Sequence, residues 1–397
     1  MLFWTICAHL YTDAEVGLAS ALLAAVNLIY TLSLMGFEVS IIRVLHEHPD
    51  KNLLFNVCIS TSSLLGIIFS LLFFLVLPHY HTDLGVVISN PFNELLFIFF
   101  VLISVADYMF NNTFIAYRAT KFAMFKNLVF SVGKLLLPFM LVAFGAYGIF
   151  SAWMFSLSIA VIYSMVVLSR RFNHTLRPRL GISPLRGILK YSLGNYVSGF
   201  AEGLPVIVLP ILIVNVYGPE QAAYYYIAMM FATFLYKIAG SATQTLLAEA
   251  PHGTQLTVLI RKVLKFLSLL LVPSILFFFV LSPYLLRIFG ANYSLGASGL
   301  LRILALTAIV NAFNSIARAI FRIGFRTVPL TIVSFLGAGV IIGFSYFFSG
   351  FGLNGVGYAN FLGEAVSLLI YSAWIFRDRK NLLFAVTSRY RVSKSST

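Results

Sequence analysis

The stretch NNTFIAYRATKFAMFK at residues 111–126 returns as NAFNSIARAIFRIGFR at residues 311–326. Five positions match at one constant offset of 200 residues: Asn111 with Asn311, Arg118 with Arg318, Ala119 with Ala319, Phe125 with Phe325, and Lys126 with Arg326. A second match sets FGAYG at 144–148 against FGLNG at 351–355, and a third sets YTDAE at 11–15 against YGPE at 217–220. Because the offset drifts by only a few residues, the repeat predicts two copies of one unit with small insertions between them.

The composition places both copies in a membrane. Of 397 residues, 60% are hydrophobic and only 10% are charged, and the mean hydropathy is +0.94. Soluble domains carry about 25% charged residues. Duplicated membrane bundles are typical of transporters whose two halves move around a central site.

The sequence contains eleven stretches that are long and apolar enough to cross a bilayer, which takes about 20 mostly apolar residues. They lie near residues 16–42, 53–77, 92–117, 124–144, 147–168, 188–215, 222–247, 261–282, 297–320, 327–348 and 354–376. We therefore expect an all-α polytopic membrane protein built from two pseudo-symmetric bundles.

The repeat also predicts how the chain is divided. An N-terminal bundle takes residues 1–168, a polar linker 169–186, a C-terminal bundle 187–376, and a basic tail 377–397. The helix predicted at 188–215 has only residues 1–10 as its counterpart, so we expect eleven full spans plus the end of a first helix. Six spans per half, twelve in all, would place the pseudo-twofold axis along the membrane normal.

The basic residues fix the predicted orientation. With the 169–186 linker in the cytoplasm, all 27 lysines and arginines except Lys134, Lys237, Arg287 and Arg302 lie at cytoplasmic loops or helix ends. This asymmetry follows the positive-inside rule and predicts a cell-membrane protein with a cytoplasmic linker and C-terminus. It also excludes a nucleic-acid partner, because the net charge of +14 is spread over many loops.

No motif of a soluble enzyme is present, so we expect no catalytic residue and no cofactor. The sequence has no GxSxG, phosphate-loop or HExxH pattern. Cys7 and Cys58 form no disulfide framework and have no metal-ligand spacing. His79 and His81 lie in one loop without a carboxylate cluster, so we predict no metal site.

Charged residues within the spans are the candidate site residues, because an unpaired charge at the bilayer centre costs at least about 2.5–3.5 kcal/mol. Lys134 and Lys237 have no acidic residue within one helical turn, and from opposite halves they would present positive charge to a common cavity. Such a cavity suits an anionic head group. Glu202 and Asp107 would neutralise them or bind a coupling cation, H⁺ or Na⁺. Further intramembrane polar residues are Glu38, Arg302, Glu364, Asn27, Asn111, Asn112, Asn195 and Asn311.

Two further features bear on the site. Arg43 follows Glu38 at the cytoplasmic end of the first full span, where it serves either as a topology anchor or as a phosphate contact. Pro205 and Pro210 fall within one span behind Gly203, so residues 203–210 are a candidate hinge or helix break.

Several stretches resemble the polysaccharide transporter family. These are YTDAEVGLA at 11–19, LMGF at 34–37, Ile42 and Arg43, KYSL at 190–193, YGPEQAAY at 217–224, and Ala248 and Glu249. The family includes the O-antigen flippases within the multidrug, oligosaccharidyl-lipid and polysaccharide exporter superfamily. The resemblance implies twelve to fourteen helices in two bundles around an often cationic cavity. It also implies the movement of polyprenyl-linked sugars to the outer leaflet. The sequence departs from the family pattern in its first helix, which is largely missing.

Three functions follow as hypotheses. The first is a flippase for lipid-linked oligosaccharide, acting as a monomer among membrane lipids by alternating access of its two halves. The second is a cation-coupled exporter of drugs or metabolites, with Asp107, Glu202 or Glu364 as the ion site. The third is a non-transporting membrane scaffold or a degraded fragment. A lipid-linked cargo requires cationic cavity residues, whereas cationic drugs require acidic ones.

Overall fold

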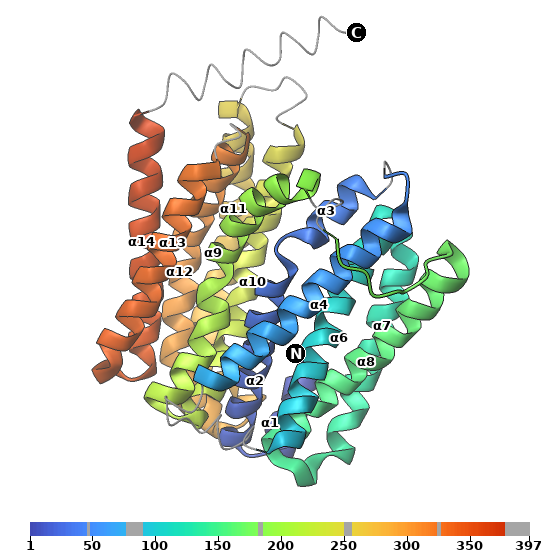
Figure 1. Ribbon diagram of the computed structural model, residues 1–397. Coiled ribbons are helices and arrows are strands. Elements are labelled where there is room, and N and C mark those ends of the chain that lie inside the picture. The colour runs from blue at the N-terminus through green and yellow to red at the C-terminus, as the bar shows by residue number, and fades with distance from the viewer. Residues whose placement is uncertain (46–47, 77–89, 182–185, 250–255, 324–326, 378–397) are drawn as a thin grey trace, which may run out of the picture. The chain divides into compact units, whose positions relative to one another are not determined.

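The computed structural model describes residues 1–45, 48–76, 90–181, 186–249, 256–323 and 327–377. These residues form helices joined by short turns, and none of them lies in a strand (Figure 1). The α-helices are α1 (Leu2–Leu10), α2 (Asp13–Leu34), α3 (Phe37–Val44), α4 (Lys51–Val76), α6 (Pro91–Ala116), α7 (Thr120–Met140), α8 (Gly145–Phe172), α9 (Arg186–Tyr217), α10 (Pro219–Glu249), α11 (Leu256–Arg287), α12 (Ala291–Ile323), α13 (Thr327–Phe347) and α14 (Leu353–Arg377).

Among the described residues, ten helices are long and apolar enough to cross a membrane: α2, α4, α6, α7, α8, α9, α11, α12, α13 and α14. The one predicted span that is missing from this set, 222–247, forms α10, where four tyrosines and Lys237 lower the hydropathy. One stripe of α10, from Leu235 to Leu246, instead packs in a core with α11 and α12. The all-α polytopic class is confirmed.

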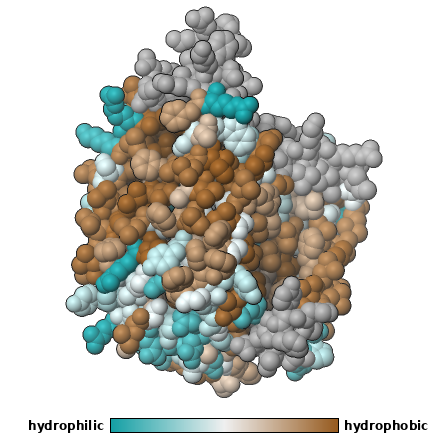
Figure 2. All heavy atoms as spheres, turned by 90° about the vertical axis from the view of Figure 1, so that its left-hand side faces the viewer, coloured by the Kyte–Doolittle hydropathy of each residue, from teal (hydrophilic) through white to brown (hydrophobic). Residues whose placement is uncertain are grey.

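The surface agrees with a membrane environment. Figure 2 shows a face that is mostly hydrophobic through its middle, with hydrophilic residues gathered toward its upper and lower ends. On α13 and α14, Leu336, Phe347, Phe361 and Leu369 are among the exposed large hydrophobic side chains. Exposed apolar side chains on this scale require lipid rather than water around them.

The chain folds into two compact units, Met1–Ala223 and Tyr224–Thr397. Helix α9 belongs to the first unit, where it packs on α2 and α3. The unit boundary therefore falls inside α10. The division predicted at residues 169–186 follows the sequence repeat rather than this packing, and it stays a prediction.

The repeat is visible in the fold as two copies of a helix, a short 3₁₀ turn and a helix. The first copy runs through α7, Val142–Phe144 and α8, and the second through α13, Phe348–Phe351 and α14. Gly145 and Gly352, 207 residues apart, both have positive φ, at +54° and +58°. Both copies thus need glycine at this turn, since other residues adopt such φ values only with strain.

The first predicted span, 16–42, is not one continuous helix. Helix α2 begins at a capping box, in which Thr12 and Glu15 bond each other's backbone N–H groups, and it ends at Leu34. Met35 and Gly36 adopt left-handed conformations, with φ of 46° and 80°, and α3 starts anew at Phe37. The segment 203–210, by contrast, lies in the continuous helix α9 despite its two prolines. The helix break predicted there is wrong.

The linker begins later than predicted and is held in place. Helix α8 continues through residues 169–172, and the chain then runs extended along α4. Asn52 and Asn56 of α4 each donate to one linker carbonyl and accept from one linker N–H, at 2.7–3.2 Å. Ser60, one turn further along α4, accepts from the N–H of Arg179 at 3.0 Å. We call this arrangement, α4 with residues 173–179, the linker dock.

His174 anchors the linker dock. Its side chain is 2% exposed, its Nε2 is hydrogen-bonded to the Tyr117 hydroxyl at 2.8 Å, and its ring lies 5.0 Å from that of Phe55. Its Nδ1 is buried without a hydrogen-bond partner among the described residues. Burial, reinforced by the charge of Lys51, lowers the pKa of His174 below its usual 6.5.

We predict that acid pH loosens the linker dock. A lowered pKa means that the docked chain prefers the neutral ring, so docking is fully stable above pH 6.5 and weakens as the pH falls below it. The hydrogen-exchange protection of the Thr175, Arg177 and Arg179 amides should fall by at most about tenfold per pH unit, since one proton is taken up. In His174→Gln the protection should not depend on pH. Equal pH dependence in both proteins would contradict the assignment.

Candidate functional site

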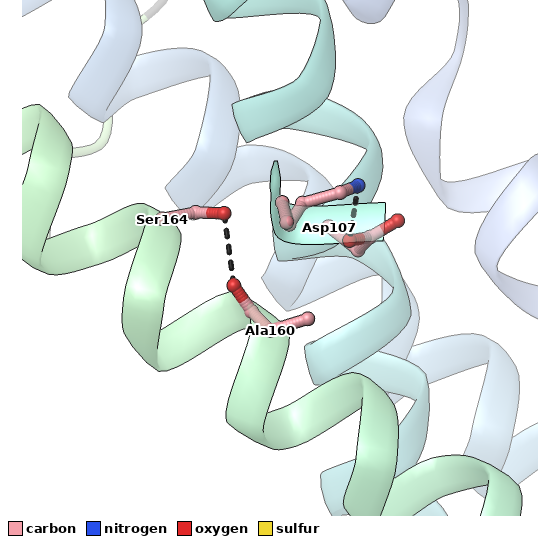
Figure 3. A network of polar contacts seen from close by, with 4 residues as sticks. Asp107, Ala160 and Ser164 are labelled. Atoms are coloured by element: carbon pink, nitrogen blue, oxygen red, sulfur yellow. Dashed lines mark hydrogen bonds and ion pairs between the residues drawn. The ribbon is translucent and has the colours of Figure 1, made fainter. Parts of the chain in front are cut away.

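A buried ion pair joins α6 to α7 in the first unit. Lys126 Nζ lies 2.7 Å from Asp107 Oδ1, and the two side chains are 3% and 16% exposed. Figure 3 shows the pair beside α8, where the Ser164 hydroxyl donates to the Ala160 carbonyl of its own helix. The attraction between the two charges offsets part of the desolvation penalty that each would carry alone. Asp107 is thus neutralised by Lys126.

The charge pattern of the sequence predicts Lys126 at a cytoplasmic helix end, and Lys126 is not among the predicted site residues. A signal for the pairing exists in the spacing. The turn between α6 and α7 runs from Tyr117 to Ala119. Asp107 lies ten residues before Tyr117, and Lys126 lies seven residues after Ala119. Two antiparallel helices joined by a short turn bring such positions to nearly the same height.

Polar groups continue from this pair across the first unit. The ring of Tyr108, next to Asp107, lies 5.1 Å from that of Tyr30 on α2. The neighbouring Thr31 hydroxyl donates to Asn27 at 3.2 Å, and the Thr31 carbonyl accepts from Tyr196 of α9 at 2.8 Å. Helices α2, α6, α7 and α9 therefore share one polar layer. Beyond the α2–α3 break, Oε2 of Glu38 is buried with no hydrogen-bond partner in the described part of the chain.

A second cluster lies between α12 and α14 in the second unit. Asn311 donates to Oε1 of Glu364 at 2.8 Å, and Asn314 donates to Oε2 at 2.6 Å and to the Glu364 carbonyl at 2.8 Å. Asn360, one turn before Glu364, is 4% exposed, and its amide nitrogen has no partner among the described residues. Oδ1 of Asn314 is equally without a partner there. This half-buried carboxylate with its amide neighbours can take up a proton or contribute to a cation site.

Lys134 is surrounded by aromatic rings rather than by a carboxylate. Its Nζ lies 4.7 Å from the ring centres of both Phe130 on α7 and Trp153 on α8. Trp153 in turn contacts Phe3 and Trp4 of α1, at 5.1 and 6.2 Å. Cation–π contacts stabilise the ammonium while leaving its charge uncompensated.

The other predicted site residues are spread over the fold. Lys237 is exposed on α10 in the second unit, whereas Lys134 is in the first, so their common cavity stays a prediction. Glu202 is half-buried on α9. Arg43 lies in α3, but its side chain is outside the described residues, as are His79 and His81.

Arg302 has a structural partner. Pro283 has no N–H, which leaves the Phe279 carbonyl, four residues earlier on α11, without its helical donor. Arg302 Nε donates to that carbonyl at 3.3 Å and to the Ser282 hydroxyl at 3.1 Å. We therefore leave Arg302 out of the candidate site. In the described part of the chain, no three His, Cys, Asp or Glu side chains come together as metal ligands.

Comparison with known proteins agrees with this architecture. The model of a family described as polysaccharide biosynthesis protein matches residues 6–295. No curated protein sequence matches the chain.

Several solved structures share the fold at low sequence identity, and three of them illustrate it. A multidrug resistance MATE family transporter of the MOP superfamily, in its inward-facing conformation, has a TM-score of 0.70 and 17% identity over 94% of this chain and 95% of that chain. The lipid II flippase MurJ has a TM-score of 0.64 and 15% identity over 99% and 91%. A MOP superfamily transporter from Pyrococcus furiosus has a TM-score of 0.59 and 17% identity over 97% and 91%.

We predict that the Asp107–Lys126 pair acts as a unit in stability. Lys126→Met leaves a buried carboxylate unpaired and should lower the free energy of unfolding by about 3–5 kcal/mol. Asp107→Leu combined with Lys126→Met removes both charges and should recover most of that loss. Denaturant unfolding in detergent measures both, with Lys121→Met, at an exposed site in the same helix, as the control. A double variant no more stable than Lys126→Met would refute the coupling.

Proposed function

The chain belongs to the polysaccharide biosynthesis protein family and is a multi-pass membrane protein with the fold of MOP superfamily transporters, and we propose that it flips a polyprenyl-linked oligosaccharide across the cytoplasmic membrane. The cargo class is an O-antigen or a related polysaccharide precursor. The match to the family over residues 6–295 carries this proposal. Movement proceeds by alternating access of the two halves, with no covalent step, catalytic residue or cofactor.

The charges within the helices support an anionic cargo. Asp107 is paired with Lys126, and Glu364 accepts hydrogen bonds from two amides. Lys134 and Lys237 have no ion pair with any described carboxylate. In this proposal the two lysines attract the pyrophosphate of the head group as point charges, while the polyprenyl tail stays in lipid.

The same proposal sets the orientation. The 169–186 linker and the C-terminal tail lie in the cytoplasm, since the basic residues gather on that side. Arg43, Glu202 and Asp107 remain proposed cavity residues. Lipid-linked sugar, surrounding lipids and a coupling ion are the partners, and one chain suffices for transport.

Flipping of a fluorescent polyprenyl-pyrophosphate oligosaccharide in proteoliposomes tests the function. We expect the full-length protein to flip it, and the Lys134→Ala, Lys237→Ala double variant to flip at least about tenfold more slowly, because two charge contacts with phosphate are lost. Lys265→Ala, which removes an exposed lysine of α11, is the matched control. An unchanged rate in the double variant would exclude the assigned roles, and no flipping by the full-length protein would exclude the function.

One observation favours an ion-coupled exporter as the second candidate function. The Glu364 cluster combines a half-buried carboxylate with the buried Asn314 amide oxygen, which has no partner among the described residues, and both are groups that an H⁺ or Na⁺ site uses. Such a site is compatible with a flippase and with a drug or metabolite antiporter. The two differ in the cargo that competes for the cavity, anionic lipid-linked sugar or cationic drug.

We predict that Glu364→Gln uncouples transport from an ion gradient. Glutamine keeps the size of the side chain but loses the titratable charge, and its amide oxygen can still accept the hydrogen bond from Asn311. Transport stimulated by an imposed pH or Na⁺ gradient should fall to the gradient-free rate, which the variant should retain. Asn360→Ala, one turn away, should weaken the stimulation less. Full stimulation in Glu364→Gln would exclude Glu364 as the coupling site.

A further inference from the structure

The linker dock fixes the direction of every side chain that it holds. The backbone N–H or C=O groups of residues 173, 175, 177 and 179 all face α4. In an extended chain, alternate side chains point to opposite faces. His174 and Leu176 pack inward against the core of the first unit, so Arg177 and Arg179 point outward, and both are exposed.

Pro178 fits this arrangement between the two arginines. In an extended chain the N–H of residue 178 would point away from α4, where no donor is needed. A proline there fixes φ without loss of a docking bond. The backbone that carries Arg177 and Arg179 is therefore held from both sides of the proline.

The end of the linker dock at which the linker begins is strongly basic. Lys51 lies 5.9 Å from the centre of the Tyr117 ring, whose hydroxyl bonds His174. Exposed cations from the α6–α7 turn and the last turn of α8 lie at the same helix ends: Arg118, Lys121, Arg170 and Arg171. The nearby carboxylate of Asp50 is occupied as the N-cap of α4, where it accepts from Leu53 N–H at 2.8 Å.

We propose that Arg177 and Arg179 form a binding site for the phosphates of a lipid head group, the pyrophosphate of the lipid-linked sugar, before it enters the transport path. The proposal rests on the proposed function and names a subsite for its substrate. Two arginines two residues apart on one face of an extended chain have Cα atoms about 6.6–6.8 Å apart. Their guanidinium groups can converge on adjacent phosphates, each with paired N–H donors.

Docking is what distinguishes this site from an ordinary basic loop. A free linker would lose backbone and side-chain freedom each time it bound a phosphate, whereas the docked linker has its backbone fixed beforehand. Asn52 and Asn56 are therefore positioning residues. They contact no ligand, and they fix the linker backbone that carries the two arginines.

Binding of farnesyl pyrophosphate to the full-length protein in detergent, followed by calorimetry, tests the proposal. Arg177→Gln with Arg179→Gln should weaken binding by about tenfold or more, as expected for lost charge-assisted hydrogen bonds. Arg170→Gln with Arg171→Gln removes the same charge from the end of α8. This variant should weaken binding of farnesyl pyrophosphate by less than about threefold, because only the long-range attraction of exposed charges is lost. Equal loss in the two pairs would overturn the site.

Undocking provides the second arm. Asn52→Ala with Asn56→Ala keeps all the arginines and should weaken farnesyl pyrophosphate binding severalfold. Hydrogen exchange at the Arg177 and Arg179 amides checks that the linker is released. Released amides with wild-type affinity would overturn the positioning role.

The choice of probe separates the sources of phosphate. Inorganic pyrophosphate lacks the lipid, and weaker but arginine-dependent binding of this probe supports a head-group site that the lipid strengthens. Binding as tight as that of farnesyl pyrophosphate would overturn the assignment to lipid. If the Arg177→Gln, Arg179→Gln variant binds farnesyl pyrophosphate normally while the wild type flips lipid-linked sugar, the proposed phosphate site is wrong and the proposed function is supported. If binding of farnesyl pyrophosphate depends on the two arginines but the wild type flips no lipid-linked sugar, the proposed function is wrong and the phosphate site is supported.

Discussion

The absence of water from the bilayer core is the constraint on which this structure depends. Every polar group at that depth needs a partner within the protein. The Phe279 carbonyl, which Pro283 leaves without its helical donor, is bonded by Arg302 from the next helix. Asp107 and Lys126 neutralise each other across α6 and α7. In both places a second helix supplies the partner, and many of the exposed side chains on the spanning helices are apolar.

The two copies of the repeat share a backbone and differ in chemistry. At the offset of 207 residues, Trp153, which stacks on Lys134, corresponds to Asn360, which lies one turn from Glu364. Lys134 itself corresponds to the apolar Ile341. One copy thus places a tryptophan against a cation where the other places an asparagine one turn from a carboxylate.

Features that depend on local sequence were predictable here. Apolar stretches located the helices, and the glycine turns at Gly145 and Gly352 marked the repeat. Contacts between helices were not predicted. Asp107 pairs with Lys126 rather than with Lys134, and only the spacing of the two residues about the α6–α7 turn indicates this in the sequence. The break at Met35 also escaped prediction, since a methionine in a left-handed conformation goes against its local preference.

Helix α10 contributes residues to both compact units. The chain passes from the first unit to the second between Ala223 and Tyr224, one turn into a helix of 31 residues that has no proline after its first position. Long helices curve only gently unless a proline, a bulge or an inserted group disrupts them. Any swing of one unit against the other must therefore bend this continuous rod or shift the point along it at which the units divide. Bending of α10 would therefore add an elastic cost to any such movement.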